Sequence, residues 1–147
     1  MKKLFVLLLS VFTFYLFTYS QGCLPEGIGF TTQQQIDEFP LIYPNCSDIE
    51  GSVLILGNDI TNLDGLINIQ TIGGELIISS NSLANLFGLG NLSLVDSTLS
   101  ITNCTNLYNL EGLNNLNSIG GELHIWNSQL TDLTGLEGLT KIFGNWI

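Results

Sequence analysis

Apolar residues recur along residues 51–147 at an almost constant interval. Triplets of the form apolar–x–apolar start 23, 23 and 24 residues apart, at Val53, Leu76, Leu99 and Leu123. A Gly-Leu pair follows each triplet with spacings of 23, 24 and 23, and these pairs begin at Gly65, Gly88, Gly112 and Gly135. Two markers with one period, and with one inserted residue in the same unit, indicate an internal repeat of about 23 residues.

Within each repeat the triplet predicts a short strand, because alternate side chains of a strand point to opposite faces. A polar turn follows, and Leu or Ile then recurs every third residue, as at Ile60, Leu63, Leu66, Ile69 and Ile72. A step of three fits a polygonal coil better than an α-helix or a straight strand. One such coil is too thin to bury its own apolar residues, so neighbouring coils must stack. The pattern predicts a mainly β fold, a parallel β-solenoid of about four to five coils.

Two columns of small or polar residues support this stacking. Gly or Ser stands before each triplet, at positions 51, 74, 97, 121 and 144, and predicts a tight corner there. A polar residue precedes an apolar Leu at Asn62, Asn85, Asn109 and Asp132. We expect these side chains to hydrogen-bond to turn backbone, and their single carboxylate is too little charge for a Ca²⁺ site. The fourth repeat continues the three-residue step with Leu130, Leu133, Leu136, Leu139 and Ile142, and Trp146 begins a fifth.

Residues 21–50 predict a cap that belongs to the same domain as the repeats at 51–147, because an open coil end would expose the core. The run Thr32-Gln33-Gln34-Gln35 fits a helix capping box. Ile36 and Phe39 then give a short helix an apolar face. Pro40 is expected to end this capping helix.

Cys23 and Cys46 flank the predicted helix, and in an exported protein such a pair is best explained by a disulfide. The loop that it closes would contribute roughly 3 kcal/mol in the chain-entropy model. The alternative, a lipid-modified Cys23, fits poorly with the preceding Ser20-Gln21-Gly22 and leaves Cys46 without a partner. Cys104 lies in the turn that carries the inserted residue, and we interpret it as a tolerated small residue rather than a nucleophile.

Residues 1–20 have the layout of a secretory signal peptide. Lys2 and Lys3 precede a largely apolar run over residues 4–17, and small residues follow near Ser20. This run is shorter than the roughly 20 residues that a membrane span needs. We expect a cleaved signal, no membrane span in the mature chain and a secreted or cell-surface location, with a retained anchor or lipid attachment as the alternative.

The charge balance argues against two classes of partner. All 13 acidic residues follow position 20, and Lys141 is then the only strong base. Nucleic acid is not expected as a partner, because its binding depends on Lys and Arg that neutralise phosphates. Anionic lipid is disfavoured for the same reason.

Two motifs resemble a known family. The segment Asn45-Cys46-Ser47-Asp48-Ile49-Glu50-Gly51-Ser52-Val53-Leu54-Ile55 resembles the start of the first strand in receptor L domains, the leucine-rich-repeat-like ligand-binding domains of insulin and epidermal growth factor receptors. The segments Ile72-Gly73-Gly74-Glu75-Leu76-Ile77-Ile78 and Ile119-Gly120-Gly121-Glu122-Leu123-His124-Ile125 resemble the version in exported bacterial surface proteins.

The resemblance implies a right-handed solenoid with a parallel sheet along one side. It implies no particular function, because such coils are scaffolds on which sites are grafted. Bacterial relatives usually carry more coils, so we expect a C-terminus that is truncated, frayed or paired.

The sequence offers little for catalysis, and we predict no enzyme, no cofactor and no metal site. His124 is the single histidine, and the spacing places no Ser, Cys or Asp beside it to form a triad. No zinc-ligand spacing is present. Glu75 and Glu122 share a column two coils apart, about 9.6 Å at the usual strand spacing, which leaves a hydrolase as a distant alternative.

The outward side of the predicted sheet is the more informative surface. Alternation places Leu54, Ile77, Ser100, His124 and Ile147 in one outward row, and Leu56, Ser79, Thr102 and Trp126 in a second. An exposed Trp beside His, with apolar and hydroxyl side chains nearby, is typical of a contact patch. The competing interpretation is that a loop or further chain covers these residues.

We therefore expect a non-catalytic recognition or adhesion module that binds protein or glycan. The candidate contact residues are Ile77, Ser100, Thr102, His124 and Trp126. The main alternative is a structural spacer within a longer surface protein.

Overall fold

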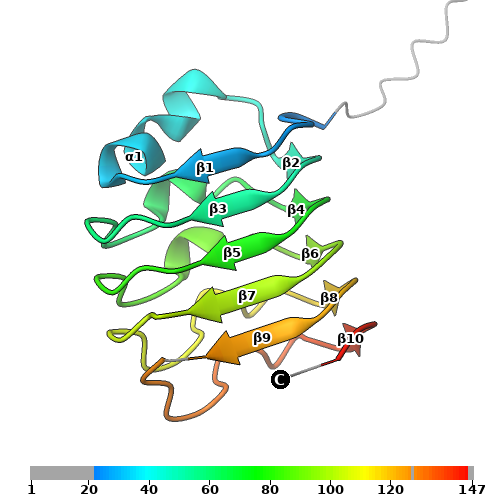
Figure 1. Ribbon diagram of the computed structural model, residues 1–147. Helices are drawn as coiled ribbons and strands as arrows, with labels where there is room; N and C mark the ends of the chain where they lie inside the picture. The colour runs from blue at the N-terminus through cyan, green and yellow to red at the C-terminus, as the bar shows by residue number, and fades with distance from the viewer. Residues whose placement is uncertain (1–21, 127, 146–147) are drawn as a thin grey trace, which may run out of the picture.

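The computed structural model describes residues 22–126 and 128–145. The predicted signal peptide, Trp146 and Ile147 lie outside these residues. The described chain is mainly β, with two five-stranded parallel sheets, one α-helix and two short 3₁₀ helices (Figure 1). The predictions of a mainly β fold and of parallel pairing are therefore confirmed.

The first sheet, here called the front sheet, faces the viewer in Figure 1. Its strands lie in the order β1, β3, β5, β7 and β9, with bounds Ile28–Phe30, Val53–Ile55, Leu76–Ile78, Leu99–Thr102 and Leu123–Trp126. Val53 pairs with Leu76, Leu76 with Leu99, and Leu99 with Leu123. The four predicted triplets thus lie in register. β1 precedes them inside the predicted cap, and its Ile28 pairs with Val53.

The second sheet, here called the side sheet, is not predicted by the repeat pattern. Its strands are β2, β4, β6, β8 and β10, with bounds Asp48–Ile49, Thr71–Ile72, Leu94–Val95, Ser118–Ile119 and Lys141–Ile142. Each strand has only two residues, which is too short for an alternating pattern to show. The chain alternates between the two sheets. We call the segment from the start of one front strand to the start of the next front strand a pass.

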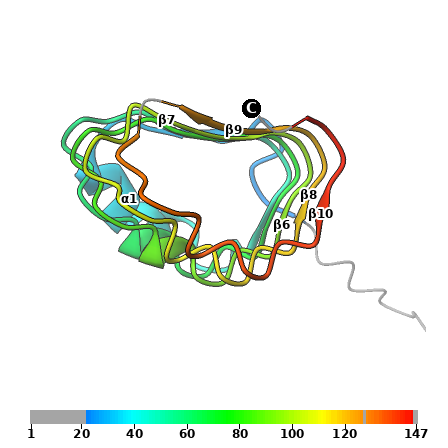
Figure 2. The same ribbon diagram turned by 90° about the horizontal axis from the view of Figure 1, so that it is seen from below.

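Each pass runs around a central space, as Figure 2 shows from below, and the buried apolar residues of successive passes form one core cluster. Val53 and Ile55 of β3 are buried, whereas Leu54 between them is only partly buried. The residues at the predicted three-residue step, Ile60, Leu63, Leu66, Ile69 and Ile72, are each at most 2% exposed. Their spacing follows from consecutive i to i−3 hydrogen bonds, since Leu66 N–H donates to Leu63 O at 2.8 Å and Ile69 N–H to Leu66 O at 2.9 Å.

The last pass departs from this pattern. Leu130, Leu136, Leu139 and Ile142 are partly buried, and Leu133 is 60% exposed. Leu133, expected in the inward column of the repeat, is therefore not buried. In the described part of the chain no further pass packs against this one, so its inward side chains gain contacts from one neighbour instead of two.

Helix α1 (Gln33–Ile42) covers the opposite end of the stack (Figures 1 and 2). The predicted capping box is confirmed, with Gln35 N–H donating to Thr32 Oγ1 and Thr32 N–H to Gln35 Oε1. Ile36 and Phe39 are buried as expected. The prediction that Pro40 ends the helix is wrong: it lies inside the last turn, where it removes one N–H but leaves the final bond from Tyr43 N–H to Phe39 O intact.

The four residues of the polar column, Asn62, Asn85, Asn109 and Asp132, each accept a hydrogen bond from the backbone N–H two residues further along the chain. Asn62 Oδ1 accepts from Asp64 N–H at 3.1 Å, and Asn85 and Asn109 repeat this bond two residues onward. Asp132 Oδ1 accepts from Thr134 N–H at 2.9 Å, and the bonds from Thr134 lower the pKa of the Asp132 carboxyl. The expected turn-backbone role of this column is confirmed.

Close stacking leaves no room for a side chain at Gly112. Its φ is +110°, and a Cβ added there would lie 2.1 Å from the carbonyl carbon and oxygen of Leu86 in the preceding pass. A Cβ added at Gly29 on β1, by contrast, would meet nothing within 4 Å.

These two glycines give a matched test of the stacking. We expect Gly112→Ala to lower the free energy of unfolding by at least about 2 kcal/mol, through backbone strain and the clash with Leu86. Gly29→Ala should leave stability unchanged or raise it by up to about 1 kcal/mol. Urea unfolding followed by circular dichroism measures both, and equal effects of the two changes would contradict the close packing at Gly112.

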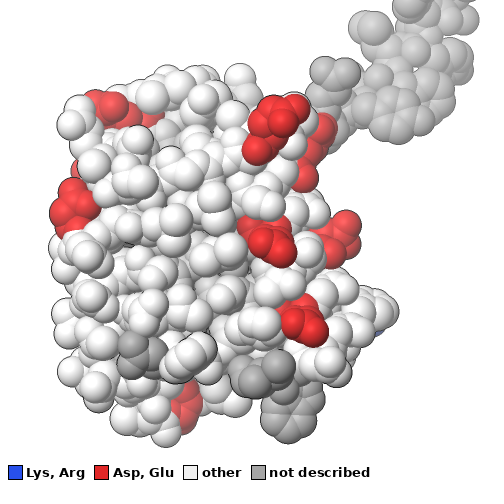
Figure 3. Space-filling model, in the orientation of Figure 1, with Lys and Arg blue, Asp and Glu red and all other residues white. Residues whose placement is uncertain are grey.

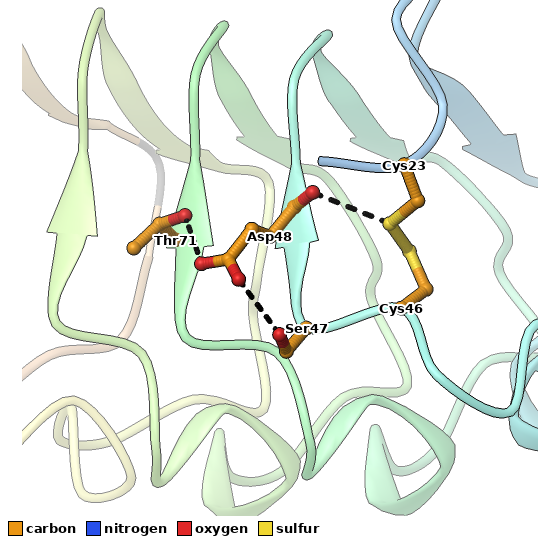
Figure 4. Close-up of a disulfide and its surroundings, with 5 residues drawn as sticks. All are labelled: Cys23, Cys46, Ser47, Asp48 and Thr71. Atoms are coloured by element: carbon orange, nitrogen blue, oxygen red, sulfur yellow. Dashed lines mark hydrogen bonds between the residues drawn. A yellow bond between two sulfur atoms is a disulfide. The ribbon is translucent and has the colours of Figure 1, made fainter. Parts of the chain in front are cut away.

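The disulfide predicted between Cys23 and Cys46 is present, with a Cα–Cα distance of 5.6 Å (Figure 4). It joins the start of the described chain to the residue two positions before β2. Cys23 N–H also donates to the Asp48 carbonyl at 2.8 Å. The Asp48 side chain links this corner to the next pass, because its carboxylate accepts from Ser47 Oγ and from Thr71 Oγ1, each at 2.7 Å.

Removal of this crosslink should destabilise the cap. We expect the Cys23→Ser, Cys46→Ser double variant to lose about 3 kcal/mol of unfolding free energy, because its unfolded chain gains the freedom of an open loop. Cys104→Ser, which leaves the disulfide in place, should lose about 1 kcal/mol. The comparison is made by urea unfolding without reductant, and an effect of the double variant no larger than that of Cys104→Ser would contradict it.

Candidate ligand-binding face

The structure brings the predicted contact residues together on the outward face of the front sheet. Leu54, Ile77, Ser100 and His124 are successive register partners on β3, β5, β7 and β9. Thr102 pairs with Trp126 one step further along. These residues, with Leu56 and Ser79 at the ends of β3 and β5, are here called the outward array. Ile147, predicted for the same row, lies outside the described residues.

The chemistry of the outward array changes along the stack. Leu54, Leu56 and Ile77 make its first half apolar, and Leu56 is 49% exposed. On β7 the outward side chains are the hydroxyls of Ser100 and Thr102. β9 then presents His124 and Trp126, and Trp126 is 76% exposed. Trp126 is thus one of the largest apolar surfaces that the described chain offers to solvent.

Glu122, which the sequence suggests only as half of a carboxylate pair, joins the array. Its Oε2 lies 2.7 Å from His124 Nε2, and both side chains are about two-fifths exposed. The two residues are neighbours because positions i and i+2 of a strand share a face. The sequence could have indicated this pair, because the alternation of the Leu123–Ile125 triplet, continued one residue toward the N-terminus, places Glu122 on the same face as His124.

Acidic groups lie around the array, and Glu122 is one of its members. Figure 3, which has the orientation of Figure 1, shows Asp and Glu at the edges of the view and in a column over its right-hand half, with an uncharged surface over much of the remaining face. Lys141 is on β10 of the side sheet. The charge on and around this face therefore disfavours a polyanion.

Four hollows lined by described residues lie away from the array. Two, of about 420 and 400 Å³, are lined by side chains of the last pass, including Leu123 and Leu133. One of about 260 Å³ lies between β1 and α1, and one of about 290 Å³ lies on the side sheet around Asp48, Glu50 and Asp96. None of these four is lined by an outward side chain of β7 or β9. The array is an open face rather than a cleft.

The surroundings of His124 differ from the sequence expectation in one respect. Ser100 is its direct register partner on β7, so the prediction that no Ser stands beside His124 is wrong. Among the hydrogen bonds of the described residues, none joins the two side chains, and His124 bonds to Glu122 instead. Within the same residues no group of three or more His, Cys, Asp or Glu side chains is arranged to hold a metal ion.

Cys104 lies beneath the array in the turn after β7. Asn103, with φ of +55°, takes up the inserted residue, and Cys104 turns into the core, where it is fully buried. Burial raises the pKa of its thiol, an effect that backbone hydrogen bonds at Ser80 and Thr102 oppose in part. A buried, protonated thiol is a poor nucleophile.

Comparisons of the chain with protein-family models, with curated proteins and with solved structures find no match. Among the residues that the structure describes, no helix has the length and apolar character to cross a membrane.

The Cys104 thiol should be protected in the folded protein. We expect a thiol-specific reagent such as DTNB to react slowly at pH 7.5 and at once after unfolding in urea, because only the unfolded chain exposes a titratable thiol. The raised pKa stabilises the fold below about pH 8.5, and this contribution is lost as the pH rises further. Fast labelling of the folded chain at pH 7.5 would contradict the buried placement.

Proposed function

We propose that this chain is an exported, non-catalytic recognition module of the receptor L-domain type, and that it binds its ligand on the outward array. In this proposal the stacked passes form a right-handed β-solenoid. Its role is to hold a flat row of side chains in fixed register. Protein and glycan are both open as ligand classes for such a face.

The arrangement of the elements supports the proposed family. The residues that resemble the receptor L-domain motif, around Asn45 and Cys46, lie between α1 and β3. There they follow the capping helix, and Cys46 forms the disulfide with Cys23. The front strands pair in parallel at the interval of the sequence repeat. Of these features, the parallel pairing is one that the resemblance implies.

Export is supported by the disulfide and by the amino-terminal sequence. Disulfides persist mainly in proteins of oxidising compartments. The basic start and apolar run of residues 1–20 have the layout of a secretory signal. We propose that the mature protein is secreted or held at the cell surface.

One observation carries the binding proposal: Trp126, 76% exposed, stands on a rigid sheet beside the His124–Glu122 pair. A Trp that is left in water has apolar area still to be buried, and aromatic residues dominate the energetics of interfaces. The side chains of β7 and β9 project from paired strands, so little conformational entropy is lost when a ligand contacts them. Open faces of this kind suit ligand recognition better than catalysis, which needs water-excluding enclosure.

The test compares the mature chain with its His124→Ala, Trp126→Ala double variant on protein and glycan arrays. We expect at least one reproducible ligand for the wild type, and a loss of roughly tenfold or more in its affinity for the double variant. Leu41→Ala is the control, because Leu41 is 79% exposed but lies on α1.

Retained binding by the double variant would contradict the array as the site. Absence of any ligand for the wild type would contradict a recognition role and favour the spacer function. Hydrolysis of a bound ligand that is lost on Glu122→Gln would contradict the non-catalytic assignment.

A further inference from the structure

We propose that the β7–β9 half of the outward array binds a neutral polysaccharide, laid across the two strands. This inference rests on the proposed function and gives it a ligand class. The half-array consists of five residues of the outward array, Ser100, Thr102, Glu122, His124 and Trp126, together with Thr98, which precedes β7 as Glu122 precedes β9. Strand alternation places these six on one face.

Every residue of the half-array carries a polar group that can form hydrogen bonds, which in Trp126 is the indole N–H. Ser and Thr hydroxyls both donate and accept, Glu122 accepts, and His124 can do either according to its tautomer. Sugar hydroxyls also donate and accept, so they can pair with each of these groups whether the side chain acts as a donor or as an acceptor. A ligand surface that is mainly apolar would desolvate the same groups without replacing their bonds to water, which costs free energy.

Trp126 supplies the apolar part of the site. A pyranose ring has one face made of C–H groups, and such a face stacks on the flat side of an aromatic ring while the hydroxyls at its rim remain free. The indole is 76% exposed and is the register partner of Thr102. A sugar on Trp126 therefore has hydroxyl and carboxylate groups within the same two strands.

Charge selects a neutral polymer. The half-array has no Lys or Arg, and its one carboxylate, on Glu122, is bonded to His124. Asp and Glu on the right-hand half and at the edges of this view would repel a polyanion (Figure 3). Uronic-acid or sulfated chains are therefore excluded as preferred ligands.

Shape selects a polymer over a single sugar. Small-molecule sites are concave and bury most of their ligand, whereas the four hollows described above do not involve the half-array. An open face gains affinity by contacting several units of an extended chain at once. Neighbouring parallel strands lie about 4.8 Å apart, so a chain laid across them contacts one strand after the other.

A protein partner fits this half-array less well. Protein interfaces of ordinary size bury about 800 Å² on each side around an apolar, desolvated centre. Here the single large apolar group stands at the end of β9, and the centre of the half-array is polar. The apolar side chains Leu54, Leu56 and Ile77 belong to the other half.

The test is affinity gel electrophoresis of the mature chain in gels that contain mannan, a linear β-glucan or arabinoxylan, followed by calorimetry on any that retards it. We expect retardation by at least one of the three and none by alginate, a polyanion. Trp126→Ala should weaken binding roughly tenfold or more, and Glu122→Gln should weaken it by a smaller factor. Tyr108→Ala is the matched aromatic control, since Tyr108 is 57% exposed in the segment between β7 and β8, and it should bind as the wild type does.

Three results would overturn the inference: no binding to any of the neutral polysaccharides, equal binding by the Trp126→Ala variant, or equal binding to alginate. Circular dichroism of each variant confirms that it is folded. If the array experiment finds a protein ligand that depends on Trp126 while all three polysaccharides fail, the glycan inference is wrong and the proposed recognition function stands. If neither class binds, both are wrong.

Discussion

The fold depends on one constraint, which is that no pass of the chain can bury its own apolar side chains. Each pass supplies a few inward residues, and they become buried only when the passes above and below are in register. Parallel backbone pairing in two sheets fixes that register, so hydrogen bonding and hydrophobic burial require the same arrangement. The partly exposed side chains of the last pass, Leu133 above all, show what a pass loses when one neighbour is missing among the described residues.

The same constraint explains the cap and the small residues. Helix α1 places Ile36 and Phe39 over the first pass, and the Cys23–Cys46 disulfide ties the segments on either side of it. Between passes the backbones approach so closely that only glycine is accommodated at Gly112. The inserted residue of the third pass is taken up locally by the left-handed conformation of Asn103, and the following polar column keeps its hydrogen bond at Asn109.

Periodicity in the sequence is enough to predict four of the five front strands (all but β1), their parallel register and the residues that share the outward face, and a local motif predicts the capping box. It does not predict the strands of the side sheet, because two residues are too few to show an alternating pattern of apolar and polar positions. It also fails at Pro40, where tertiary packing keeps a helical turn that local preference disfavours, and at Leu133, whose burial depends on a neighbour rather than on its own repeat. The Glu122–His124 bond escapes the triplet pattern because the outward row extends one residue before the triplet. The identity of a ligand follows from surface chemistry, on which the repeat pattern places no restriction.

Strand alternation also places alternate residues of one strand under different evolutionary constraints, with the inward ones constrained by packing and the outward ones by surface contacts. In β7, Leu99 and Ile101 are fully buried, whereas Ser100 between them contributes nothing to the core. The outward positions of successive strands are therefore free to drift, one at a time, without loss of the fold. A lineage of such chains would be expected to keep its inward columns and diversify its outward rows, and a combinatorial library randomised at Leu54, Ile77, Ser100 and His124 would sample new specificities on an unchanged scaffold.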